Sequence, residues 1–207
     1  MDRRKFLKTS TVAGGATLLA NSFSFADSIP IHAPWFDRSM RWAQLAFVEN
    51  DPDHYDPDFW LDYFKKIHAD GALLSAGGVV AFYPTEIPLH HRSEWLGSSD
   101  PLGYMVKGCR KMNMSVILRT DPHAARQNVF DAHPDWIAVT TDGNPRRHWA
   151  NKELWVTCAL GPYNFEFMTS VKKEIMDRYQ PEAIFSNRWA GHGICYCEHC
   201  KKNFKTF

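Results

Sequence analysis

The sequence predicts an α/β fold built on a parallel sheet. Short apolar segments with the length of strands alternate with longer amphipathic segments, and this order requires right-handed crossovers between parallel strands. The segments after the strands are long and polar, whereas those after the helices are short, which is typical of a (β/α) barrel of the TIM-barrel type. A complete barrel has eight strands in about 250 residues. The sequence yields about four βα units, so we expect the N-terminal half of a barrel.

Four strands are expected in apolar segments rich in Val, Ile, Leu and Ala: Arg41 to Val48, Ala72 to Ser75, Met114 to Arg119, and Ala183 to Ser186. The segment DWIAVTTDGNPRRHW predicts a hairpin that turns at Asp142-Gly143-Asn144.

Three helices connect these strands. Asp56 is the expected N-cap of the first helix, which begins at Pro57 and which Gly71 is expected to stop. Asp100 is expected to cap a second helix that runs to about Met112. The third helix is expected from Tyr163 to Tyr179.

The N-terminus has the pattern of an export signal. It contains, in order, an arginine pair, a weakly apolar run and small residues suited to a signal peptidase: Arg3-Arg4, Thr11 to Ala20, Ser24 and Ala26. Because the apolar run is shorter than the roughly 20 residues that cross a bilayer, we expect a twin-arginine signal over residues 1–26 and no membrane span. The alternative is the basic N-terminus of a cytosolic protein. The expected location is periplasmic or extracellular, with residues 27–40 as a linker or N-terminal arm and 41–207 as the half-barrel.

Charge and composition narrow the choice of partners. Removal of residues 1–26 leaves 20 basic and 22 acidic side chains, so no basic field remains to hold a phosphate backbone, and we expect no nucleic acid as a partner. Aromatic residues make up 14% of the chain, with eight tryptophans. Burial explains most of them, although aromatic platforms also bind sugars.

The five cysteines include a C-x-C-x-x-C motif at Cys195, Cys197 and Cys200. Disulfides would leave one thiol over, and a redox pair at Cys197 and Cys200 lacks the usual setting at the start of a helix after the first strand. A tetrahedral zinc site needs four ligands, of which this motif supplies three. Candidates for the fourth are Cys158, Cys109, His192 and His199. We therefore expect zinc.

The stretches CYCEHCKKNF and ELWVTCALGPYNFEFM together resemble the zinc-bearing β-galactosidases of glycoside hydrolase family 42. That resemblance implies Cys158 as the fourth ligand and leaves Cys109 free and buried. The segments WAQLAFVENDP, LRTDPH, AHPDWIAVTTDGNPRRHW and IFSNRWAGHG resemble more closely the hypothetical glycosyl hydrolases, which are related to the same clan, clan A. The resemblance extends from Trp42 to Phe207 and implies a glycosidase-like barrel.

One departure from the family 42 pattern concerns the proton donor. In those enzymes the fourth strand ends in Asn-Glu, where Glu is the general acid/base and Asn bonds the sugar's 2-hydroxyl. Here Asn187 matches the Asn, but Arg188 takes the place of the Glu, and an arginine cannot donate a proton at ordinary pH. The resemblance places the nucleophile on a later strand, outside these 207 residues.

The remaining polar residues at strand ends are the candidate site. Glu49 follows the first strand and Asp121 the third, so these two carboxylates are the candidate catalytic pair. An Asp before Pro, as at Asp121, is also a common turn-former. The candidate substrate-binding residues flank the same strand ends: Arg119, His123, Asn187, Arg188 and Trp189. The loop histidines His90 and His91 either bind sugar hydroxyls or satisfy loop backbone.

The sequence therefore predicts a glycoside hydrolase-like protein that acts on O-glycosidic bonds of a carbohydrate substrate, with structural zinc. Two alternatives remain open: a non-catalytic carbohydrate-binding barrel, favoured by the missing acid, and a dithiol oxidoreductase, which needs Cys197 and Cys200 free of metal. We also expect the 207 residues alone to self-associate through the open half-barrel and to show no turnover of aryl glycosides.

Overall fold

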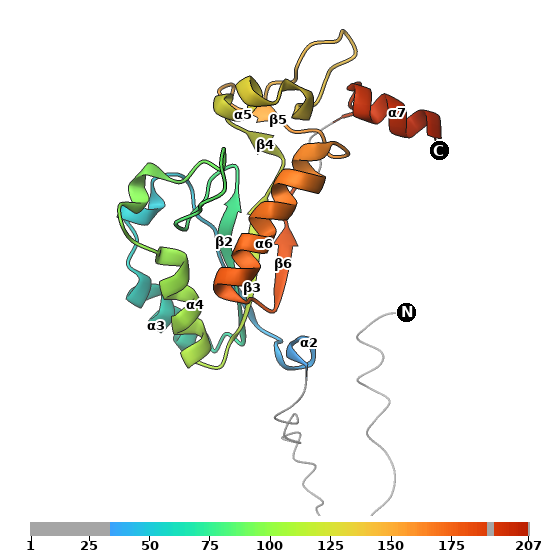
Figure 1. Cartoon of the computed structure of the whole chain (residues 1–207). Coiled ribbons are helices and arrows are strands. Elements are labelled where there is room, and N and C mark those ends of the chain that lie inside the picture. Colours follow the sequence, from blue (N-terminus) through green and yellow to red (C-terminus); the bar gives the residue numbers. More distant parts are fainter. Residues whose placement is uncertain (1–33, 190–192, 207) are drawn as a thin grey trace, which may run out of the picture. The chain divides into compact units, whose positions relative to one another are not determined.

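A four-stranded parallel sheet lies at the centre of the fold (Figure 1). The computed structural model describes residues 34–189 and 193–206. The strands lie in the order β1 (Trp42–Leu45), β2 (Gly71–Gly78), β3 (Ser115–Asp121) and β6 (Ala183–Ser186). Each neighbouring pair is parallel, so the predicted half-barrel of four parallel strands is confirmed.

Helices α3 (Pro57–Lys66), α4 (Pro101–Lys111) and α6 (Met168–Tyr179) connect the strands. The predicted N-caps are confirmed: the Asp56 side chain accepts hydrogen bonds from the backbone of Asp58 and Phe59, and Asp100 accepts one from Gly103. The third predicted helix is one helical segment, since a π-helical turn (Tyr163–Phe167) leads directly into α6.

The predicted role of Gly71 was wrong. Helix α3 ends at Lys66, and the chain turns through His68, whose φ of 55° lies in the left-handed region. Gly71 instead begins β2, where a Cβ atom would lie 2.7 Å from the ring of Trp42. Close packing against a neighbouring strand, rather than the end of a helix, therefore requires glycine at this position.

Several shorter elements were not predicted: α2 (Trp35–Arg38), α5 (Gln127–Ala132), α7 (Glu198–Thr206), the two-stranded antiparallel sheet of β4 (Ala124–Ala125) and β5 (Trp155–Val156), and 3-10 turns at Asp51–Asp53, Glu94–Leu96 and Pro134–Trp136. The predicted hairpin is present, because Arg146 N–H bonds the carbonyl of Ala138 at 2.8 Å and Thr140 N–H bonds that of Asn144 at 2.9 Å.

Residues 34–40 belong to the described structure, and α2 falls within the segment expected to be a linker or N-terminal arm. The hydroxyl groups of Ser39 and Ser115 share a buried hydrogen bond of 2.7 Å, which fixes this segment to the start of β3. The predicted signal over residues 1–26 lies outside the described residues. Within those residues, no helix combines the length and apolarity needed to cross a bilayer.

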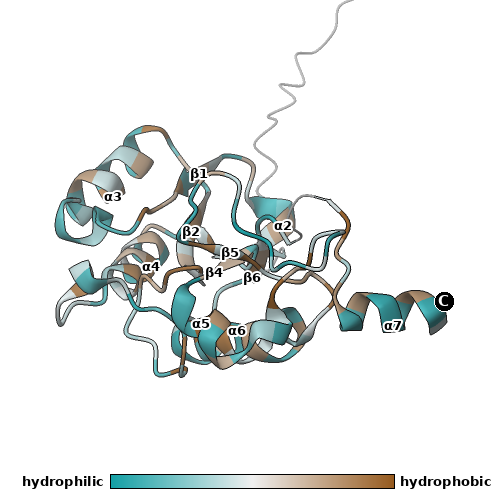
Figure 2. Cartoon of the chain, turned by 90° about the horizontal axis from the view of Figure 1, so that it is seen from above, coloured by the Kyte–Doolittle hydropathy of each residue, from teal (hydrophilic) through white to brown (hydrophobic). Residues whose placement is uncertain are grey.

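The sheet has one covered face and one partly exposed face. Along β3, Val116, Leu118 and Thr120 are fully buried, whereas Ile117, Arg119 and Asp121 alternate with them and keep some exposure. The covered side packs against α4 and α6, whose ribbons in Figure 2 carry alternating hydrophilic and hydrophobic segments. The other face corresponds to the inside of a barrel, and it places Arg119 and Asp121 where a barrel holds its site.

Candidate active site and metal centre

A cavity of about 1050 Å³ lies at the carboxyl ends of the strands. Parallel strands bring their following loops to one edge of the sheet, and each of the four strands, or the segment that follows it, contributes residues to this cavity. The predicted site residues in its lining are Glu49, Arg119, Asp121, His123 and Arg188, together with the loop histidine His91.

Glu49 is held by two cationic or hydrogen-bonding partners. One carboxylate oxygen lies 3.0 Å from Nε2 of His91, and the other forms an ion pair with Arg126. All three side chains are half-buried. The sequence left the role of His91 open and did not identify Arg126. No local sequence pattern distinguishes Arg126 from any other arginine beside a short helix until the loops are folded.

Asp121 is held by neighbours on two strands. The guanidinium of Arg119 approaches both of its carboxylate oxygens, at 3.0 Å each. From the end of β6, the Asn187 side-chain amide donates a hydrogen bond of 2.5 Å to the same carboxylate. Arg119 therefore forms its ion pair with a carboxylate of the cavity. Asn187 contacts the cavity through its hydrogen bond to Asp121.

Gly78 brings β2 unusually close to Asp121. Its φ is 118°, and a Cβ atom there would lie 2.3 Å from the carbonyl oxygen of Asp121. The next residue, Val79, donates its N–H to that same carbonyl at 3.1 Å. Only glycine permits this approach, which sets the position of the Asp121 backbone.

His123 and Arg188 lie beside an aromatic cluster. The His123 ring is 5.4 Å from that of His148 and 5.8 Å from that of Trp149, and burial lowers the pKa of His123 to about 4. The guanidinium of Arg188 lies 5.9 Å from the centre of the Trp149 ring. A neutral histidine and a charged arginine therefore share this part of the lining.

Trp189, predicted to bind substrate, lies apart from the cavity lining. Its ring contacts Phe165 edge-on at 6.0 Å, and the ammonium of Lys172 lies 5.1 Å from its centre. The β6 strand end thus sends Arg188 into the cavity and Trp189 towards α6. The sequence alone could not show that Arg188 and Trp189 point in different directions, since the direction of each side chain depends on the left-handed φ of 51° at Arg188.

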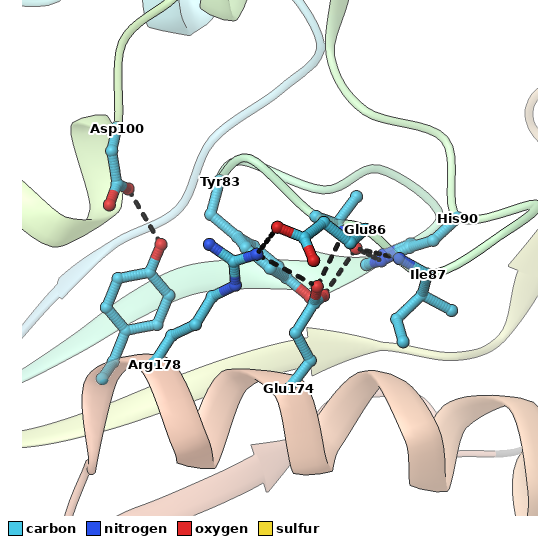
Figure 3. A network of polar contacts seen from close by, with 9 residues as sticks. Tyr83, Glu86, Ile87, His90, Asp100, Glu174 and Arg178 are labelled. Carbon is cyan, nitrogen blue, oxygen red and sulfur yellow. Dashed lines mark hydrogen bonds and ion pairs between the residues drawn. The ribbon is translucent and has the colours of Figure 1, made fainter.

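A polar network fixes the long loop between β2 and α4 (Figure 3). Glu174 on α6 accepts hydrogen bonds from the hydroxyl groups of Tyr83 at 2.7 Å and Thr85 at 2.6 Å, and from the backbone N–H of Glu86 at 2.7 Å. Arg178 lies 3.5 Å from the same carboxylate. Burial raises the pKa of Glu174, but the hydrogen bonds from Thr85 and Tyr83 outweigh burial and hold the pKa below its usual value.

His90 extends this network to the cavity. Its Nε2 accepts the backbone N–H of Gly78 at 3.1 Å, so Nδ1 carries the proton and faces Thr85 Oγ1 at 3.2 Å. His90 therefore satisfies loop backbone, one of the two roles that the sequence allowed. The next residue, His91, contacts Glu49, so the Glu174 network positions a residue of the cavity from outside it.

Four cysteines form a cluster that can hold a metal ion: Cys158, Cys195, Cys197 and Cys200, whose sulfur atoms all lie within 4.8 Å of one another. Cys158 Sγ is 3.4 Å from Cys197 Sγ and 3.5 Å from Cys200 Sγ. Four sulfurs around one metal at about 2.3 Å would be about 3.8 Å apart. The described cysteines are all free thiols, so the donor set fits a tetrahedral metal.

The surroundings of the cluster also suit thiolates. Cys195 Sγ accepts backbone N–H groups from Val139 at 3.4 Å and from Cys197 at 3.5 Å, which offsets negative charge on sulfur. Of the other candidates for the fourth ligand, Cys109 is buried in α4, and Nε2 of His199 faces Asp135 at 3.4 Å. His192 lies outside the described residues.

The cluster connects three parts of the chain. Cys158 precedes the third helical segment, Cys200 lies on α7, and Val139 of the hairpin donates to Cys195. The N–H of Tyr196 also bonds the carbonyl of Val139 at 2.9 Å. A bound metal would therefore fasten the segment after β6 to the hairpin.

The parallel sheet and the cavity at its strand ends define the half of a (β/α) barrel. Residues 56–188 match the family model described as hypothetical glycosyl hydrolase 6, and the chain belongs to that family. None of the curated proteins compared with the chain matches it.

Solved structures with the same fold include glycosidases. α-L-Fucosidase isoenzyme 2 from Paenibacillus thiaminolyticus is 18% identical with a TM-score of 0.62, over 80% of this chain and 26% of the fucosidase. A maltogenic α-amylase, AmyB, from Thermotoga neapolitana is 15% identical with a TM-score of 0.50, over 80% of this chain and 43% of the amylase. A hypothetical protein from Ruminiclostridium thermocellum is 12% identical with a TM-score of 0.51, over 72% and 75% respectively. The chain thus spans about a quarter of the fucosidase and less than half of the amylase.

Proposed function

We propose that this chain provides the first four βα units of a barrel that cleaves O-glycosidic bonds with a pair of carboxylates. The observation that carries the proposal is that Glu49 and Asp121 line one cavity at the carboxyl ends of the strands. Glycosidases place two carboxyl groups roughly 5 to 9.5 Å apart around the scissile bond. The family of the chain supports a glycoside hydrolase-like role.

The partners of the two carboxylates suggest their roles. Asp121 is paired with Arg119 and Asn187, and Glu49 with Arg126 and His91. A carboxylate bonded to a guanidinium is suited to act as a nucleophile or a base. Asp121, whose two oxygens both face Arg119, takes that role in the proposed pair, and Glu49 takes the other.

A non-catalytic carbohydrate-binding barrel is the second candidate function. The observation that favours it is Arg188, which lines the cavity at the end of β6 where the family 42 pattern has its acid. A dithiol oxidoreductase is disfavoured, because Cys197 and Cys200 lie with Cys158 and Cys195 in one cluster.

For the cysteine cluster we propose structural zinc. Four thiolates complete tetrahedral coordination and leave no position for water, so the metal would stabilise the loop rather than take part in bond cleavage. The family 42 resemblance and the sulfur separations both support this choice. Export by the twin-arginine route remains a prediction, and it would allow metal to be loaded before the folded chain leaves the cytoplasm.

Sugar binding by the chain tests the site. Saturation-transfer NMR with a panel of mono- and oligosaccharides should show binding that Asp121→Asn and Glu49→Gln reduce, whereas Glu86→Gln, in an exposed side chain outside the cavity, should not. If no sugar binds, both carbohydrate functions are wrong.

Turnover separates the enzyme from the binding protein. We expect no release of nitrophenol from aryl glycosides by these 207 residues, but release by a barrel completed with four further βα units. A completed barrel that binds sugar and releases nothing would support the binding function instead.

A further inference from the structure

Three arginines and three carboxylates line the cavity, and two of each are paired with one another. Its lining includes Arg119, Arg126 and Arg188. Arg119 pairs with Asp121, and Arg126 pairs with Glu49. Across residues 34–189 and 193–206, no carboxylate lies within ion-pairing distance of Arg188. Among the residues that the structure describes, Arg188 therefore has no acidic partner.

The structure holds this cation in place. The residue before it, Asn187, is fixed by its N–H bond of 2.8 Å to the Thr120 carbonyl and by its side-chain bond to Asp121. Arg188 itself has a φ of 51°, a conformation that a residue with a Cβ adopts at an energetic cost. Its guanidinium faces the ring of Trp149, which supports the charged plane.

We propose that Arg188 binds the anionic group of an acidic sugar, so that the site selects glycans carrying a carboxylate or a sulfate ester. This deepens, and rests on, the proposed carbohydrate function. The planar fork of a guanidinium matches two oxygens of a carboxylate or sulfate.

Glu153 sets the orientation of such a ligand. It lines the same cavity, its side chain is exposed, and it forms no ion pair with Arg188. Its charge repels an anion from that side of the cavity. The anionic group therefore binds on the Arg188 side of the cavity.

Isothermal titration of the chain with matched sugars tests the proposal. The probes are galacturonic acid, galactose 6-sulfate and galactose, which share one ring and differ in the group at C6. The acidic sugars should bind about tenfold more tightly than galactose, since a hydrogen bond to a charged group contributes about that factor. The tighter of the two acidic sugars identifies carboxylate or sulfate as the preferred group.

Three variants locate the effect. Arg188→Ala should abolish the preference, so that the acidic sugars bind no more tightly than galactose does to the same variant, whereas Arg188→Lys should retain part of it. Glu153→Gln should strengthen binding of both acidic sugars. Arg41→Ala is the control, because it removes a guanidinium that pairs with Asp70 at the other end of the sheet.

The outcomes separate this inference from the function on which it rests. Galactose and the acidic sugars binding equally, or a preference that survives in Arg188→Ala, would overturn the role of Arg188 while leaving sugar binding intact. No binding of any of the three, or of the wider saccharide panel, would overturn both.

Discussion

The carboxylate of Glu174 and the hydroxyl of Tyr83, 91 residues apart in the chain, share a hydrogen bond of 2.7 Å that joins helix α6 to the loop after β2. The same oxygen of Glu174 accepts from Thr85, and the other accepts from the backbone of Glu86. This single side chain therefore fixes the loop that carries His91 to the cavity.

Glu174→Gln should lower the free energy of unfolding by about 1–3 kcal/mol, because an amide nitrogen replaces one accepting oxygen and leaves a part-buried donor unpaired. Denaturation in urea measures the change. Glu166→Gln, in an exposed side chain of the turn that precedes α6, is the control and should stay within about 0.5 kcal/mol. Equal effects of the two variants would contradict the role of the network.

Stability should fall as the pH decreases from about 6.5 to about 4. Burial lowers the pKa of His90 from its ordinary 6.5 to about 4, so the unfolded chain takes up the proton first. The stabilisation is fully present above pH 6.5, and the loss, on the order of 3 kcal/mol, is complete once the pH is below the folded pKa.

His90→Gln isolates this contribution. A glutamine can accept from Gly78 and donate to Thr85 without titrating, so part of the pH dependence should disappear, while His123, whose pKa burial also lowers to about 4, retains its share. Urea denaturation at a series of pH values provides the comparison. A variant with the same pH profile as the original chain would show that His90 is not the titrating group.

Gly78→Ala should destabilise the chain by more than about 3 kcal/mol or prevent folding, since the new methyl group meets the Asp121 backbone at 2.3 Å. Gly97→Ala is the matched control: its φ of 54° is also positive, but no atom lies within 4 Å of the added Cβ. It should cost about 1 kcal/mol. Thermal melts of the two variants distinguish steric contact from backbone strain alone.

The chain purified without chelator should carry about one zinc per molecule. Cys158→Ser should lower zinc affinity more than about tenfold, whereas Cys109→Ser, at a residue that is also fully buried, should leave it unchanged. Elemental analysis and a competition assay with a chromogenic chelator provide the readout. Similar behaviour of the two variants, or a disulfide at Cys195 in freshly folded protein, would refute the proposed ligand set.

Self-association should depend on the partly exposed face of the sheet. Phe185 on the edge strand β6 is 46% exposed, and Trp42 on the opposite edge strand β1 is 39% exposed. Phe185→Lys should weaken association more than about tenfold, because a charge on an edge strand opposes pairing. Phe59→Lys, on α3, is the control, and sedimentation velocity across a range of concentrations measures both. A monomeric original chain would contradict the prediction.

Much of this protein could be predicted from local sequence. Asp56 and Asp100 cap helices because a short acidic side chain reaches the free N–H groups of a first turn, and that requirement is met within three residues. The fourth strand, Ala183–Ser186, and the placement of Asp121 and Glu49 at strand ends follow from the same alternation of segments. The grouping of Cys158 with the C-x-C-x-x-C motif came from resemblance rather than spacing, and the structure brings those four sulfurs together.

Only the tertiary structure decided which of these groups contact one another. Arg126 became a partner of Glu49, and His90 and His91 acquired different roles, because loops from separate strands meet at one edge of the sheet. The direction of Trp189 away from the cavity depends on one left-handed residue at position 188. Helix caps and strand periodicity are set by neighbours a few residues away, whereas ion pairs between loops depend on distances that exist only once the sheet has formed.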